Sequence, residues 1–202
     1  MFHIRSASFL PLGLLLLGAC ASTIDRRVDA DSPDEVGGAV LQSQDIRTMA
    51  QQMSRDIGST GILTSTANNE TVRFYIMRME NQSSDVINNE IIVSSIETEL
   101  IKAYGARIVV LDRSSVGLDA VKREREAKRS GAVAGNEGKR SDVLGSDYVL
   151  YGVIRDRQQQ SGKLRSAYYA ITFTLTDLES DRKVWQNAYE TKFLSEKSVI
   201  SR

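Results

Sequence analysis

The sequence contains few of the side chains on which enzymes and metal sites depend. Among its 202 residues there is one cysteine, Cys20, and one histidine, His3. No disulfide can form within such a chain, so its fold must be held by packing and hydrogen bonds alone. Long apolar stretches are also missing: Phe9–Leu17, near the N-terminus, is much shorter than the ~20 apolar residues that a membrane-spanning helix needs.

The N-terminal segment nevertheless has the pattern of an export signal. A short region with Arg5 precedes the apolar stretch, which leads into Leu17-Gly18-Ala19-Cys20, a lipobox whose cysteine follows the cleavage point. We predict that residues 1–19 are removed and that Cys20 carries a diacylglyceryl group and a further acyl chain such as palmitate. Two or more acyl chains anchor a protein stably to a membrane. The predicted location is the cell envelope, on the outer membrane facing the periplasm, because no aspartate follows Cys20 at the second position.

Cleavage and lipidation would leave the mature chain without a histidine or a free thiol. That removes Ser-His-Asp and Cys-His nucleophile systems and zinc sites built from these ligands. Of the 26 basic and 26 acidic residues, only Arg5 lies in the removed segment. The mature chain is therefore close to neutral and gives no electrostatic reason to expect nucleic acid as a partner. We predict a protein that is not an enzyme, with no cofactor, no metal and no small-molecule substrate.

Composition divides the mature chain into a tether and one folded domain. Residues 20–42 are small, polar and acidic, with a single proline, Pro33. We interpret them as the lipidated cysteine followed by a flexible tether. Residues 21–42 would reach ~75 Å at full extension and ~26 Å as a coil. Residues 43–202 are predicted to form a single globular domain.

The periodicity of this domain predicts alternating helices and strands. Apolar residues recur with helical spacing after Ser43, which can cap a helix that Gly58 ends, and again from Ile92 to Gly105. Residues 116–129 are predicted as a charged helix. The order α-β-α-β-α-β-β-β predicts an α/β fold, bordering on α+β, with helices flanking a mixed sheet. Strands are expected at 72–77, 107–111, 147–155, 169–175 and 184–193, a polar turn at 158–163 and a short helix at 141–144.

Aromatic side chains on the last strands are the residues most open to a binding role. Tyr168 or Tyr169, with Trp185 and Tyr189, could form a platform that binds a sugar or a protein partner, but aromatic residues also fill sheet cores and cross-strand pairs. The basic helical segment 122–129 could contact anionic lipid or glycan, or form a solvated helix face. The loop 131–138 has three glycines without the spacing of a phosphate-binding loop.

Several segments resemble one family of small bacterial lipoproteins. Residues 145–154, GSDYVLYGVI, are similar to the signature G-A-D-Y-V-L-x-G-x-I of activators of penicillin-binding proteins of the LpoB type. The resemblance spans residues 43–193, although such strand–hairpin patterns also occur in CsgG-like and TolB amino-terminal domains. Further matches are residues 79–83 to an N-x-T/S loop, 129–131 to a Q-x-G segment, and 175–179 with 184–185 to a final hairpin, in which Asp181 or Arg182 stands for a turn glycine.

The resemblance implies a non-catalytic protein that docks on a bifunctional peptidoglycan synthase and stimulates glycan polymerisation and crosslinking. One departure bears on this role. The best-known tether of the family is long and proline-rich, whereas residues 21–42 are short and hold one proline. The alternative is a CsgG-like or flagellum-associated structural or assembly lipoprotein of the outer membrane. A hydrolase that uses carboxylates is a third hypothesis.

Overall fold

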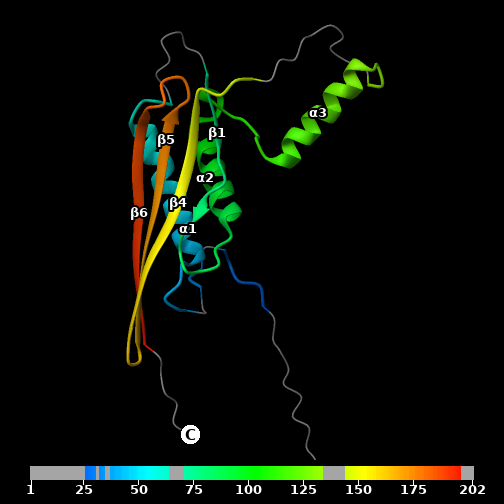
Figure 1. Cartoon of the computed structure of the whole chain (residues 1–202). Helices are drawn as coiled ribbons and strands as arrows, with labels where there is room; N and C mark the ends of the chain where they lie inside the picture. The colour runs from blue at the N-terminus through cyan, green and yellow to red at the C-terminus, as the bar shows by residue number, and fades with distance from the viewer. Residues whose placement is uncertain (1–25, 31, 35–36, 64–70, 134–143, 197–202) are drawn as a thin grey trace, which may run out of the picture. The chain divides into compact units, whose positions relative to one another are not determined.

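The structure, a computed structural model, describes residues 26–30, 32–34, 37–63, 71–133 and 144–196. The chain divides into two units, Met1–Ser32 and Pro33–Arg202, and all helices and strands of the described residues lie in the second. In chain order these elements are α1 (Ser43–Ser59), β1 (Val72–Ile76), β2 (Glu80–Asn81), α2 (Asn89–Tyr104), a 3-10 turn (Gly105–Arg107), β3 (Ile108–Val110), α3 (Ser115–Arg129), β4 (Tyr148–Ser161), β5 (Leu164–Asp177) and β6 (Lys183–Glu196) (Figure 1).

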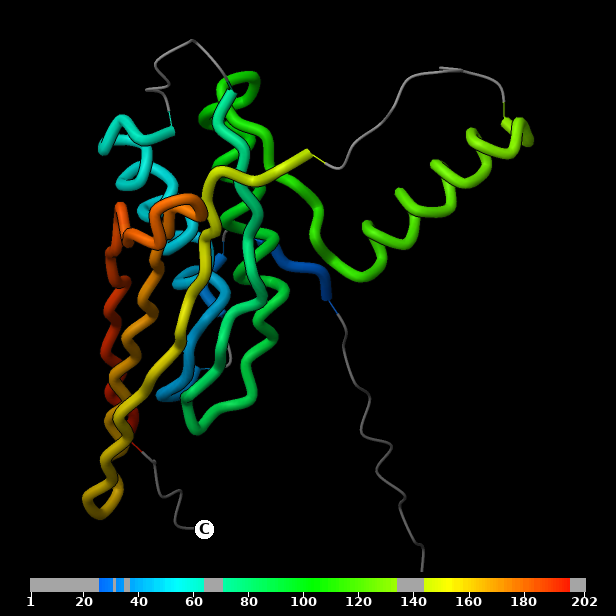
Figure 2. Tube along the Cα trace, turned by 45° about the horizontal axis from the view of Figure 1, so that its top comes forward, coloured from blue at the N-terminus to red at the C-terminus, as the bar shows by residue number. Residues whose placement is uncertain are grey.

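The sheet combines a parallel and an antiparallel part. β1 pairs in parallel with β3 and with β4, and the short strand β2 also pairs in parallel with β4. β4, β5 and β6 form a long antiparallel meander, so the strand order is β3-β1-β4-β5-β6 (Figure 2). The mixed sheet and the predicted element order are confirmed, and the fold lies on the α+β side of the expected boundary.

α1 and α2 pack on one face of the sheet and form the main core with it. Along β4 and β5, the side chains that point to these helices are apolar, as with Leu150, Phe173 and Leu175. Burying a side chain of this size contributes about 1.5–3 kcal/mol, so this layer supplies much of the stability. The helices contribute Met49, Met53 and Ile57 from α1, and Ile92, Ile96 and Leu100 from α2.

Some predicted boundaries were wrong. Residues 158–163, predicted as a polar turn, are mostly strand: β4 continues to Ser161 and pairs with Leu164 across a turn of Gly162 and Lys163. Backbone pairing with β5 sustains this part of β4 without apolar side chains, and Gly162 supplies the φ of 56° that the turn needs. The two-residue strand β2 is too short to give a periodic signal. The expected helix at 141–144 lies outside the described residues, except for Leu144.

α3 differs from the other two helices because it contributes no buried residue. Local interactions stabilise it. The hydroxyl of Ser114 accepts the backbone N–H of Gly117 at 3.0 Å, and Lys128 pairs with Glu124 one turn away at 3.1 Å; such caps and pairs support an exposed helix. Within the described part of the chain, no helix has the length and apolar character to cross a membrane.

Gly152 lies on β4 under the side chains of Met79 and Phe173. A Cβ built at this position would lie 2.7 Å from Cε of Met79 and 3.0 Å from a ring carbon of Phe173. The methionine tip can move, but the ring of Phe173 is fixed in the core. Gly152→Ala should therefore lower the free energy of unfolding by about 1–3 kcal/mol, measured by urea denaturation.

Gly145→Ala is the matched control, because a Cβ at Gly145 would meet no heavy atom within 4 Å. Its unfolding free energy should change by no more than ~0.5 kcal/mol. Equal losses in the two variants would contradict the close packing at Gly152.

Candidate partner-binding surface

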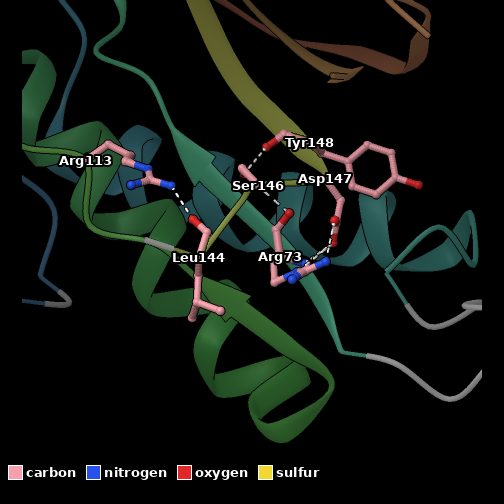
Figure 3. A network of polar contacts seen from close by, with 6 residues as sticks. All are labelled: Arg73, Arg113, Leu144, Ser146, Asp147 and Tyr148. Atoms are coloured by element: carbon pink, nitrogen blue, oxygen red, sulfur yellow. Dashed lines mark hydrogen bonds and ion pairs between the residues drawn. The ribbon is translucent and has the colours of Figure 1, made fainter. Parts of the chain in front are cut away.

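Residues 145–154, which carry the signature described above, join the two parts of the sheet. Asp147 precedes β4, and its carboxylate accepts three hydrogen bonds from Arg73 of β1, from the backbone N–H at 2.9 Å, Nε at 3.3 Å and Nη2 at 3.0 Å (Figure 3). The backbone N–H of Asp147 donates in turn to the carbonyl of Arg73 at 2.7 Å. Hydrogen bonds between charged groups are stronger than neutral ones, so Asp147 holds the start of β4 against β1.

Two further contacts secure the segment that leads into β4. The hydroxyl of Ser146 donates to the carbonyl of Tyr148 at 2.8 Å, and Nη2 of Arg113 donates to the carbonyl of Leu144 at 2.6 Å (Figure 3). These polar groups are bonded to the chain itself. The Ser-Asp part of the signature is therefore explained by the construction of the sheet.

Alternation along β4 places the rest of the signature on both faces of the sheet. Leu150 and Ile154 point into the core, whereas Tyr151 and Val153 point to the opposite face. No helix of the described residues packs on this opposite face, which we call the open face. From the strand register, its members include Arg73 and Tyr75 on β1, Val149, Tyr151, Val153, Arg155 and Arg157 on β4, Tyr168, Ala170, Thr172 and Thr174 on β5, and Gln186, Ala188, Glu190 and Lys192 on β6.

The open face is closely packed even though no described helix covers it. Val149 and Thr174, on the central strands, are only 6% and 3% exposed. Tyr151 and Val153 are half-buried beside them, and Arg155 is exposed. A centre of apolar and aromatic side chains with charged residues around it is the composition of many protein–protein interfaces.

Of the three aromatic residues predicted to contact a partner, Tyr168 lies on the open face. It is half-buried on β5, between Arg157 of β4 and Lys192 of β6. A hydrogen bond with the carboxylate of Glu190 is the main reason that the pKa of Tyr168 is raised above its usual value. The carboxylate of Glu190 therefore favours the protonated hydroxyl of Tyr168.

Trp185 and Tyr189 lie on the other face, against α1. The indole Nε1 of Trp185 donates to Oδ2 of Asp56 at 3.0 Å, and the hydroxyl of Tyr189 donates to Oδ1 of Asp45 at 3.3 Å. Burial, followed by the nearby charge of Asp45, raises the pKa of Tyr189. These two aromatic residues fasten β6 to α1, so the three residues do not form one platform.

A second polar group, which sequence reasoning did not single out, braces the loop after β2. Ser84 donates to the carboxylate of Asp156 from its backbone N–H at 3.0 Å and from its hydroxyl at 2.5 Å. Nε2 of Gln158 also donates to this hydroxyl at 2.7 Å, and the hydroxyl of Tyr169 donates to Asp85. The partners lie more than 70 positions apart in the sequence, so periodicity could not reveal them.

The two remaining sequence candidates are at the N-terminus and on α3. Cys20 lies outside the described residues, so its lipidation stays a prediction. The basic segment 122–129 lies on α3, where Arg129 pairs with Glu126 at 3.2 Å with both side chains 75% exposed. These ion pairs favour the interpretation of the segment as a solvated helix face.

The protein is a small α+β domain with helices on one face of a mixed sheet. The residues of its signature stabilise this sheet. A family model described as the peptidoglycan-synthase activator LpoB matches residues 45–191. The match covers most of the chain, so the chain belongs to the LpoB family of peptidoglycan-synthase activators. This is a family of regulators rather than of catalysts.

Comparison with solved structures finds related domains at low sequence identity. The C-terminal domain of LpoB from Salmonella enterica is 13% identical, with a TM-score of 0.42, over 73% of this chain and 98% of that domain. The corresponding Escherichia coli domain is 10% identical, with a TM-score of 0.42 and the same coverage of 73% and 98%. Lipoprotein GNA1162 from Neisseria meningitidis is 17% identical, with a TM-score of 0.41, over 64% of this chain and 88% of that one. No curated protein matches.

Asp147→Ala should weaken the join between β1 and β4. It removes the acceptor of the three hydrogen bonds from Arg73, but both side chains are 37% exposed, so water replaces part of the interaction. We expect the free energy of unfolding to fall by about 1–3 kcal/mol, measured by urea denaturation.

The control for this variant is Arg78→Ala, which removes an ion pair with Glu90 at 3.7 Å whose side chains are 80% and 71% exposed. Its effect should not exceed ~0.5 kcal/mol, because exposed ion pairs contribute little. If Asp147→Ala were as mild as this control, the junction would not depend on the aspartate.

Proposed function

We propose that this protein is a lipid-anchored envelope protein that binds a bifunctional peptidoglycan synthase, a penicillin-binding protein, and stimulates it without catalysing a reaction itself. The observation that carries the proposal is the family match over residues 45–191. It begins inside α1 and ends inside β6, and therefore takes in the whole arrangement of helices and sheet. Activation of peptidoglycan synthesis is the role of the family, and we propose that this chain acts by binding one synthase directly.

Lipid attachment at Cys20 is the second part of the proposal. The lipobox Leu17-Gly18-Ala19-Cys20 ends an apolar segment of the length of a signal peptide. Acylation would hold the mature protein in the envelope, and the residues after Cys20 favour the outer membrane, facing the periplasm. No cofactor, metal, nucleic acid or small substrate enters this function.

The open face is the surface through which we expect the synthase to be bound. α1 and α2 occupy the opposite face, whereas the open face offers half-buried Tyr151, Val153 and Tyr168 with arginine and lysine around them. Hot spots in interfaces are enriched in tyrosine and arginine. Tyr168, half-buried between Arg157 and Lys192, is one such tyrosine.

The function is tested with the purified mature chain carrying Cys20→Ser, which keeps the protein soluble. Added to the bifunctional synthases of the host, it should raise the rate of glycan polymerisation of one of them severalfold, measured by consumption of lipid-linked substrate. A monofunctional glycosyltransferase of the same host is the control and should not respond. Absence of both binding and stimulation across all bifunctional synthases would reject the proposal; a large symmetric ring in solution would favour the assembly alternative.

Tyr168→Ala tests the contact surface. Truncating a central interface tyrosine typically costs about 1–3 kcal/mol, so we expect the affinity for the synthase to fall by about 5- to 150-fold, measured by surface plasmon resonance. Lys102→Ala on α2, whose side chain is 66% exposed on the helical side, should bind as the natural protein does. An unchanged affinity of Tyr168→Ala, with the fold intact by circular dichroism, would move the contact away from this part of the open face.

A further inference from the structure

The chain just before α1 is fastened to the domain, although its composition is that of a tether. Residues 20–42 were predicted as the lipidated cysteine and a flexible segment, whereas the compact unit begins at Pro33. Within this segment, Asp34 contacts the start of α1 and Ala39 contacts the sheet, while Leu41 packs against the main core.

Asp34 binds the first residue of α1. Its Oδ2 accepts the backbone N–H of Ser43 at 2.8 Å, and its Oδ1 accepts the hydroxyl of Ser43 at 2.8 Å. Ser43 was predicted to cap α1, but the N-cap residue is Gln42, and the hydroxyl of Ser43 is used to hold Asp34. The first N–H groups of a helix lack partners within the helix, and the helix dipole favours a negative charge there.

Ala39 is buried in a small cluster apart from the main core. It is 2% exposed and packs against Ala167 and Tyr169 of β5, which are both 0% exposed. The hydroxyl oxygen of Tyr169, whose proton is donated to Asp85, lies 3.4 Å from the carbonyl oxygen of Ala39. We refer to the contacts of Asp34 with Ser43, and of Ala39 with Ala167 and Tyr169, as the clasp.

The clasp can open without dismantling the rest of the domain. α1 keeps its own cap when Asp34 leaves, because the backbone N–H of Gln42 is bonded to Oδ2 of Asp45 at 3.0 Å. Tyr169 keeps its hydrogen bond to Asp85 when Ala39 leaves. The hydrogen bonds of Asp34 are exposed to solvent, and small contacts of this kind open locally at a much lower cost than global unfolding.

We propose that the clasp sets the reach of the membrane tether: closed, it ends the tether at Pro33, and opened, it releases the chain up to Val40, because Leu41 packs against the main core and Gln42 stays bonded to Asp45. With the clasp closed, residues 21–33 span at most ~45 Å; with it open, residues 21–40 span at most ~70 Å. Opening therefore adds about 25 Å at full extension. Opening of the clasp does not depend on the function proposed above. The importance of the added reach rests on that proposed function.

The opening is measured by thiol labelling, for which the chain is well suited because Cys20 is its one cysteine. In the mature chain carrying Cys20→Ser, Ala39→Cys places a thiol in the clasp and Ala50→Cys places one in the main core, where Ala50 is 0% exposed. The thiol at position 39 should react at least about 100-fold faster than the thiol at position 50, because local opening exposes it. Its labelling rate should depend little on the urea concentration at low urea. Adding Asp34→Ala should raise this rate by about 2- to 30-fold and leave the rate at position 50 unchanged.

Two results would overturn the clasp. The first is an equal labelling rate, with equal urea dependence, at positions 39 and 50. The second is a rate at position 39 that does not respond to Asp34→Ala. Because a cysteine could itself disturb the packing of Ala39, amide hydrogen exchange of residues 37–40 in the chain without Ala39→Cys provides a second measurement. These amides should exchange through local opening and should exchange faster with Asp34→Ala.

The reach is tested in cells with the lipidated protein. Deleting residues 22–30 shortens the tether by nine residues and should reduce synthase activation, and adding Asp34→Ala to the deletion should restore part of it. Full activity of the shortened protein, or failure of Asp34→Ala to restore it, would reject the reach proposal. The soluble mature chain distinguishes failure of the reach proposal from failure of the proposed function. If the reach proposal alone is wrong, this chain still stimulates the synthase in vitro.

Discussion

β4 is the strand on which the rest of the sheet depends. It pairs in parallel with β1 and β2 and antiparallel with β5, so it is the joint between two kinds of sheet. Its register decides which side chains are buried: a slip of one residue would expose Leu150 and Ile154 and bury the set that now faces outward. The bonds between Asp147 and Arg73 hold that register at the point where β4 meets β1.

This dependence gives the sequence signature of residues 145–154 a physical meaning. Its aspartate joins two strands, its glycine leaves room for Phe173, and its alternating apolar residues fill both faces. None of these tasks is chemical catalysis. The signature of residues 145–154 therefore describes how this sheet is built.

Helical and alternating periodicity were enough to predict the order of the elements, because both helices of the core and the three long strands keep an apolar side. The polar end of β4 carries no such signal, since its pairing with β5 is made by the backbone. Periodicity also placed Trp185 and Tyr189 on one side of β6, but it did not show which side of the sheet the helices cover. Their partner acids, Asp56 and Asp45, lie 129 and 144 residues away on α1, and only the folded chain brings them together.

The tether links this architecture to the proposed function through a competition between reach and local concentration. For a tethered domain, a linker shorter than the distance to the partner prevents binding, whereas a linker much longer than that distance dilutes the domain. A fixed linker suits one distance. A short linker can gain length by releasing a weak contact, such as that of Ala39 with β5. Such a linker keeps the domain concentrated near the membrane until a more distant partner is bound. The binding energy of that partner then stabilises the open form, because a ligand shifts an equilibrium by its preference for one state.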